Sequence, residues 1–369
     1  MAISVSAIIL TTGCGDRSDQ IPTEKVGLPS LEELHLATGA EDLPEREPTT
    51  IALTSDGLLS YPTAAREGSR FITIDSTGTI VARWSRAGEG PGESWTGYLA
   101  SGDSVIALVS TNPPTLQVYT GRGELLSEQR GQPVDGFPQT ALIGDSVDRS
   151  FGQRLVGRTH VLEDIPGPIV RACIYTDCRR ELLGADHPIL SQVHEATPRK
   201  GGLRWPPFAA EPGRFVLGDG VGYRLWLFDA DGKTAMEFGR QLPPRGPTNR
   251  EFDAELAARA GQINGGSAVD SAAVLKQLSQ ERLPHFGYGS LGFDGEHRLW
   301  VAGRTRYSTF LDVFADTTFL GRRMVDCQSD RGAFAVRGRW LGLVCVDESN
   351  DSTPIRVRLF RIVEGEHER

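Results

Sequence analysis

The chain has 369 residues, of which 39% are hydrophobic and 24% charged, a composition typical of a globular protein long enough to bury a large core. Lys and Arg total 39 against 48 for Asp and Glu, which gives a formal net charge of -9. A chain this acidic lacks the basic surface on which nucleic-acid binding depends, so we expect no nucleic-acid partner.

The first 14 residues have the features of an export signal. Residues 2–10 form an apolar run, and Gly13 and Cys14 follow before the chain turns polar. A run of ~10 apolar residues suits a signal peptide better than a membrane span. Gly13-Cys14 resembles the end of a bacterial lipobox, although Leu10 stands one position early and no Lys or Arg precedes the run. We therefore expect residues 1–14 to be removed and Cys14 to carry lipid as the sole membrane attachment. The alternative is an unprocessed apolar N-terminus with a buried Cys14.

Residues 15–47 are polar and rich in Pro and Glu, and they predict a tether followed by a lead-in strand around residues 34–36. From residue 48 to 365 one pattern recurs, in which an apolar strand, a Gly- or Asp-containing turn and a second strand follow one another. Six such pairs at a period of roughly 45 to 55 residues predict an all-β fold, a six-bladed β-propeller. The second strands of the pairs cover residues 71–74, 116–120, 172–175, 225–228, 311–314 and 357–360.

One interval is longer than the others and has a helical pattern. Residues 250–283 predict two helices, and this insertion lies between the fourth and fifth predicted blades. In the second helix Val274, Leu275 and Leu278 share one face, and Ser267 with Asp270 resembles a capping box.

The cysteines support export. With Cys14 lipidated, an even number remains, which suggests two disulfides in an oxidising compartment. Cys173 and Cys178 are close enough to join across a tight hairpin, while Cys345 lies in a predicted strand and Cys327 in the segment that leads into its sheet. The alternative, a tetrathiolate zinc site, lacks a C-x-x-C knuckle.

The repeats resemble those of six-bladed, NHL-like propeller lipoproteins of bacteria. The Gly-rich residues 86–93 resemble the linker that closes a blade in that family. Residues 291–301 resemble its Asp-x-x-Gly-x-Leu-Trp-Val strand, except that His297 stands where the family has Gly. The resemblance covers most of residues 49–363. It implies a fold and a cell-envelope location, periplasmic or surface-facing, and no single activity.

Candidate ligand-facing residues are few. His160, His194 and His285 belong to distant repeats that a propeller can bring to one face, although surface or hydrogen-bonded histidines explain them equally simply. Trp95, Tyr98 and Trp205 lie in linkers between blades, where exposed rings stack on sugars or grip peptides and buried rings pack between blades.

Three motifs that suggest chemistry have structural explanations. The glycines of residues 88–93 lack the Lys-Ser/Thr ending of a phosphate loop and predict a blade-to-blade turn. Residues 229–232 resemble the start of a calcium loop, but the strands on either side predict a hairpin turn. Gly289-Ser290-Leu291-Gly292 precedes a strand and does not match a nucleophile elbow.

We therefore expect a monomeric, non-catalytic binding or scaffold propeller for an envelope protein, peptide or glycan, without a cofactor. One alternative is a metal-dependent hydrolase or lyase of the lactonase type, in which residues facing the channel hold calcium or another divalent ion. A purely structural role in a lipoprotein assembly is another. The catalytic residues of the enzyme alternative cannot be assigned from the sequence.

Overall fold

The structure is a computed structural model of the whole chain. Its description covers residues 28–36, 43–44, 48, 50–66, 69–88, 90–94, 97–111, 114–130, 139–143, 146–150, 154–156, 161–163, 169–173, 179–196, 199–200, 203–204, 206–233, 235–262, 270–281, 283–287, 289–305, 308–327, 333–346 and 355–364.

The described strands form six four-stranded antiparallel sheets, in which strands that follow one another along the chain pair, except that β1 pairs with β28 in the last sheet. The first three sheets contain β2 (Ala52–Leu53), β3 (Leu59–Arg66), β4 (Ser69–Ile74) and β5 (Ile80–Arg86); β6 (Tyr98–Ser101), β7 (Val105–Thr111), β8 (Pro114–Thr120) and β9 (Leu125–Arg130); and β10 (Gln139–Ile143), β11 (Ser146–Ser150), β14 (Ile169–Cys173) and β15 (Arg179–Leu183).

The remaining three sheets contain β18 (Phe208–Glu211), β19 (Arg214–Asp219), β20 (Arg224–Asp229) and β21 (Ala235–Gly239); β22 (Leu291–Phe293), β23 (Leu299–Arg304), β24 (Thr309–Ala315) and β25 (Thr318–Val325); and β26 (Phe334–Arg337), β27 (Trp340–Val346), β28 (Ile355–Val363) and β1 (Ser30–Leu34). Two small hairpins form separate two-stranded sheets. In one, β12 (Arg154–Val156) pairs with β13 (Val161–Glu163), and in the other, β16 (Arg199–Lys200) pairs with β17 (Leu203–Arg204).

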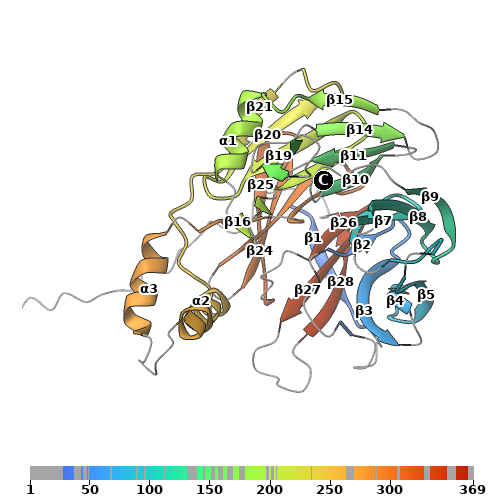
Figure 1. Cartoon of the computed structure of the whole chain (residues 1–369), viewed down its shortest axis with the longest axis horizontal. Coiled ribbons are helices and arrows are strands. Elements are labelled where there is room, and N and C mark those ends of the chain that lie inside the picture. The colour runs from blue at the N-terminus through green and yellow to red at the C-terminus, as the bar shows by residue number, and fades with distance from the viewer. Residues whose placement is uncertain are drawn as a thin grey trace, which may run out of the picture.

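The first strands of the sheets surround a common axis. β2 contacts β6, β6 contacts β10, β10 contacts β18, β18 contacts β22, β22 contacts β26, and β26 contacts β2 again. A closed cycle of first strands, with the later strands of each sheet farther out, is the architecture of a β-propeller. The predicted all-β propeller is therefore the observed fold (Figure 1).

The hydrophobic core lies between neighbouring sheets. One cluster joins the first two sheets through stacked Phe71, Trp84 and Tyr119, and another joins the fifth and sixth sheets around Trp300. Trp226, Trp300 and Trp340 lie inside apolar strand patterns of the sequence, which predict core positions, and all three are buried. Further clusters join the sixth sheet to the first, the third to the fourth and the fourth to the fifth, so neighbouring sheets are held together by apolar packing.

The N-terminal strand completes the last sheet. β1 pairs antiparallel with β28, from Ser30 opposite Val363 to Leu34 opposite Leu359. The lead-in strand predicted around residues 34–36 therefore lies earlier and belongs to the C-terminal sheet. The sequence pattern did not indicate this pairing, because it joins segments that are more than 300 residues apart. Next to this sheet Cys327 and Cys345 form a buried disulfide, which confirms one of the two expected bridges.

Three helices lie in connections between sheets. α1 (Pro188–Ala196) precedes the fourth sheet and was not predicted, whereas α2 (Asn249–Gln262) and α3 (Ser271–Gln280) lie between β21 and β22. Asp270 caps α3 by accepting from Ala272 N and Ala273 N, so the cap is Asp270 and not the expected Ser267. Figure 1 shows α2 and α3 outside the sheets, across the molecule from β3–β5. Among the described helices, none is long and apolar enough to cross a membrane.

Candidate functional site

The first strands surround a narrow cavity on the propeller axis. Its volume is about 90 Å³, and its walls are mainly small or apolar residues from five of the six sheets. Tyr98 lies at one end, and burial raises the pKa of its hydroxyl. Arg337, the last residue of β26, lies at the other end. The wall residues between them include Ala100, Ala209, Ala210, Gly292, Ala335 and Val336.

The end of the cavity marked by Arg337 opens among the turns that join the first and second strands of the sheets, and we call this opening the turn mouth. Hydrogen bonds connect these turns around the axis. Gly295 N donates to Gly338 O over 2.7 Å, and Ser55 donates to Asp103 O from both N and Oγ over 2.8 and 2.7 Å. The backbone at the mouth is therefore fixed by contacts between different sheets.

Arg337 and Asp103 form an ion pair across the turn mouth. Arg337 Nε lies 2.8 Å from Asp103 Oδ1, although the two residues belong to the sixth and second sheets. The Arg337 side chain is only 10% exposed, whereas that of Asp103 is 69% exposed. A guanidinium at the end of an apolar cavity is costly to bury, and this pairing offsets part of that cost.

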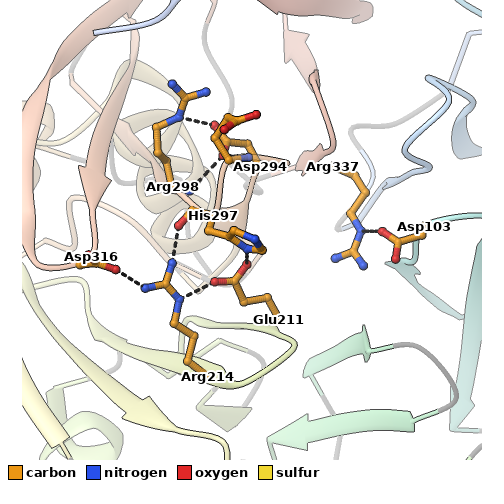
Figure 2. A network of polar contacts seen from close by, with 9 residues as sticks. Asp103, Glu211, Arg214, Asp294, His297, Arg298, Asp316 and Arg337 are labelled. Carbon is orange, nitrogen blue, oxygen red and sulfur yellow. Dashed lines mark hydrogen bonds and ion pairs between the residues drawn. The ribbon is translucent and has the colours of Figure 1, made fainter. Parts of the chain in front are cut away.

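Glu211 and His297 form a second pair at the turn mouth. His297 Nδ1 lies 2.8 Å from Glu211 Oε2, and Arg214 also contacts this carboxylate. Arg214 reaches the fifth sheet too, where it donates to the carbonyl of His297 and to Asp316. Glu211 is nearly buried, while 68% of the His297 side chain is exposed. Figure 2 shows these side chains facing the Arg337–Asp103 pair across the mouth.

His297 lies in the turn between β22 and β23. Its φ of 61° is left-handed, a conformation that favours Gly. A non-Gly residue in this conformation costs about 1–2 kcal/mol, so His297 is held by its contacts with Glu211 and Arg214.

A further group of ion pairs lies outward from the turn mouth. Arg298 is bound by Asp294 on one side and by both carboxylate oxygens of Glu364 on the other, and Trp300 Nε1 donates to Asp294 over 2.7 Å. Arg298 and Glu364 border a groove of about 750 Å³, which the end of β28 also lines. Arg339 and Arg361 lie on its wall, and Arg361 is paired with Glu32.

A buried charge cluster lies between the fourth and fifth sheets. Asp312 is fully buried and accepts from Tyr223, Arg240 and Arg322. Burial, and next the charge of Asp312, raises the pKa of Tyr223 well above its usual value. Both oxygens of Asp312 therefore accept from donors of the protein itself. The cluster joins two sheets, and its carboxylate has no oxygen left unpaired for a ligand.

The predicted ligand-facing residues do not form a site together within the described chain. His285 is buried against the Tyr223 ring, and burial, together with the charges of Arg245 and Arg322, lowers its pKa to about 4. His194 is buried in α1, which packs on the fourth sheet, and Tyr98 lines the cavity. Trp95, Trp205 and His160, as well as Cys14 and Cys178, lie outside the described residues. The Cys173–Cys178 bridge therefore stays a prediction.

The Gly-rich linker and residues 229–232 form turns, as the sequence predicts. Gly90 N donates to Glu93 over 2.8 Å and Gly92 N to Glu128 over 2.7 Å, so the protein's own carboxylates occupy these amides of the Gly-rich linker. Asp229 accepts from Asp231 N and Lys233 N, which confirms a hairpin turn.

In the described part of the chain, no group of three or more His, Cys, Asp or Glu side chains is arranged to hold a metal ion.

The residues of the turn mouth were not predicted from the sequence. Arg337, Asp103, Glu211 and His297 are separated by up to 234 positions, and no linear motif joins them. A usable signal existed in the repeat itself. Each ends or follows the first strand of its sheet, just before the predicted pair of strands, and residues at equivalent repeat positions meet around a propeller axis.

Fold and site together define the class of protein as a β-propeller with a polar turn mouth over a narrow axial cavity. No family model and no curated protein matches the sequence. Similar solved structures include a Bacteroides fragilis protein described as exported, with 12% identity over 93% of this chain and 98% of that chain and a TM-score of 0.49. Others are a DUF4221 member from Bacteroides vulgatus (12%, 92% and 98%, TM-score 0.48) and a Xanthomonas campestris gluconolactonase (11%, 92% and 98%, TM-score 0.46).

Proposed function

We propose that the chain is a six-bladed, NHL-like binding propeller of the cell envelope, and that its turn mouth holds a peptide or protein partner. The observation that carries this proposal is the narrowness of the axial cavity, about 90 Å³. Pockets that enclose whole small molecules measure about 300–1,000 Å³, so a partner must bind mainly at the mouth. Six four-stranded sheets among the described residues, with first strands in a closed cycle, support the number of blades.

The turn mouth is suited to binding because its polar groups are fixed before a partner arrives. Asp103, His297 and Asp316 expose their side chains, yet each is tied to a neighbouring sheet by an ion pair or a hydrogen bond. Groups that are already ordered lose little conformational entropy on association. Both signs of charge are present, which favours a peptide or protein surface with complementary charges.

An exported location is part of this proposal. The buried Cys327–Cys345 disulfide supports it, because thiols in the cytosol are normally kept reduced. With lipid on Cys14, the chain is held at the membrane by its N-terminus. Cys14→Ser is therefore expected to move the protein from the membrane fraction to the soluble fraction. Unchanged partitioning would count against the anchor.

Photo-crosslinking in intact cells tests the binding function. A photoreactive amino acid at Asp103 or His297 is expected to give the same discrete crosslinked product, because both positions line the turn mouth. Met236, an exposed apolar residue on the outer strand β21, is the matched control and should give none. Equal crosslinking from all three positions, or none from the mouth, would contradict a partner at this site.

The alternative, a metal-dependent hydrolase or lyase, is tested by elemental analysis of the purified chain together with lactone hydrolysis. A stoichiometric divalent ion with turnover that a chelator abolishes would favour the enzyme over the binding module. Such a result would direct attention to ligands outside the described residues.

A further inference from the structure

We propose that Arg337 is a carboxylate-binding residue, so that the turn mouth takes the carboxylate of a short aliphatic acid or of a peptide C-terminus. This assignment deepens the proposed function and rests on it. The assignment rests on two observations: the hydrogen-bond donors of Arg337 that no described residue accepts from, and the shape of the axial cavity that Arg337 lines.

The donors of Arg337 are only partly used. A guanidinium carries five N–H groups, and in Arg337 the Nε–H is bound by Asp103 at 2.8 Å. No other described side chain or carbonyl accepts from its two Nη nitrogens. In Figure 2 the dashed line to Asp103 starts from Nε, and neither Nη atom carries one. The Arg337 side chain is 10% exposed, and its Nη atoms are not among the buried polar atoms without a partner, so solvent reaches them at the mouth. A carboxylate that replaces this solvent accepts from two N–H groups in parallel, and such charge-assisted hydrogen bonds are strong.

The cavity beyond Arg337 fits a small aliphatic group. Its volume of about 90 Å³ is close to the volume that about three water molecules occupy in the liquid. Ala209, Ala335 and Val336 provide apolar walls, while Arg337 supplies the charge at one end. A carboxylate bound at the mouth would therefore place a stem of two or three carbons, or the methyl of a C-terminal Ala, against these walls.

The geometry around Arg337 is rigid. The residue ends β26 directly before Gly338, whose φ of 55° forms a tight turn, and Gly338 O accepts from Gly295 N. A Cβ on Gly338 would lie 3.1 Å from Ser55 O, so the turn also packs closely against the first sheet. The turn after Arg337 is thus held by contacts from the first and fifth sheets, and the guanidinium itself is held by Asp103 of the second sheet, so the site needs little rearrangement to bind.

The buried carboxylate of Glu211 does not oppose an incoming carboxylate. Glu211 lies across the mouth but is already paired with Arg214 and contacts His297. Its negative charge is therefore largely neutralised within the protein. Asp103 is bound to the Nε side of Arg337, which leaves the Nη side to the ligand.

The test is a titration of the full-length purified chain with sodium propionate, followed in ¹⁵N–¹H spectra of the arginine side chains. Propionamide, which has the same shape without the charge, is the chemical control. Propionate is expected to give a saturable shift of the Arg337 signals and propionamide none. Arg337→Met should raise the dissociation constant by about tenfold or more, because it removes charge-assisted hydrogen bonds. Arg339→Met is the matched control, since Arg339 is exposed in the same hairpin and contacts Trp340, and it should leave binding unchanged.

Arg337→Lys keeps the test informative if Arg337→Met does not fold. Lys retains the charge without the paired donors, so a smaller loss of affinity is expected. Equal binding of propionate by wild type and Arg337→Lys, or an equal response to propionamide, would overturn the assignment. An Ala-Ala-Ala peptide with a free C-terminus, compared with its amidated form, separates a peptide from a free acid as the source. Persistent crosslinking at the mouth without propionate binding would overturn the carboxylate assignment alone, whereas loss of both would overturn the binding function too.

Discussion

His297 combines an unfavourable backbone conformation with an exposed side chain, a combination that is common at functional sites. Its left-handed φ of 61° predicts different costs for two substitutions. His297→Val is expected to lower the free energy of unfolding by about 1–2 kcal/mol, because a β-branched residue is poorly tolerated there. His297→Gly should stay within about 1 kcal/mol of wild type, since the relieved strain offsets the lost contact with Glu211. Urea unfolding measures both, and equal losses would mean that the backbone is not held left-handed.

His285 predicts how stability depends on pH. Its pKa is about 4 in the folded chain against an ordinary value of 6.5, chiefly because of burial. Between these values the unfolded chain binds a proton that the folded chain does not. The contribution of His285 to the free energy of unfolding is therefore expected to be fully present above about pH 6.5 and to be lost as the pH drops toward 4.

The measurement is urea unfolding from pH 7 to pH 5, with His285→Gln as the comparison. Glu128 and Glu251 have lowered pKa values, so their stabilising effect is lost only below about pH 4.5 and does not interfere in this range. His285→Gln should flatten the slope between pH 6.5 and 5. A slope that is equally steep without His285 would assign it to other groups.

At the level of elements, the Cys327–Cys345 disulfide joins the connection after β25 to the central strand β27 of the last sheet. The two residues are separated by 18 positions, and a loop of this length implies a stabilisation of about 3 kcal/mol from the restricted unfolded chain. In urea unfolding, the double variant Cys327→Ala/Cys345→Ala is expected to lose about that much free energy of unfolding. Dithiothreitol should destabilise the wild type more than the variant, in which only the predicted Cys173–Cys178 bridge is left to be reduced. Equal stability of wild type and variant would contradict this role.

The strand β1 predicts a sharp boundary for N-terminal truncation. It covers the edge of β28, and Leu28 and Leu31 pack into the cluster around Trp300. Deleting residues 1–36 is expected to lower the melting temperature by about 5–10 °C or more, because it removes two apolar anchors and exposes a strand edge. Deleting residues 1–26 should leave the melting temperature unchanged. Calorimetry compares the two, and equal melting temperatures would show that β1 does not close the last sheet.

At the scale of the whole molecule, the sequence predicted what repeats locally. Alternating apolar strands and Gly- or Asp-containing turns indicated the propeller, and the core tryptophans followed from their positions inside strand patterns. Contacts that depend on ring closure were not visible in this way. The pairing of β1 with β28, and the meeting of Arg337 with Asp103, join residues separated by 234 positions or more, and only the closed cycle of sheets brings them together.

A crystal structure of the purified chain grown with propionate tests the central claim most directly, because it examines the ring and the mouth at once. We expect six four-stranded sheets around one axis, with β1 on the last sheet and the propionate carboxylate bound to the Nη atoms of Arg337. A ring with a different number of sheets, or a mouth in which Arg337 binds no propionate and turns away from the cavity, would contradict it.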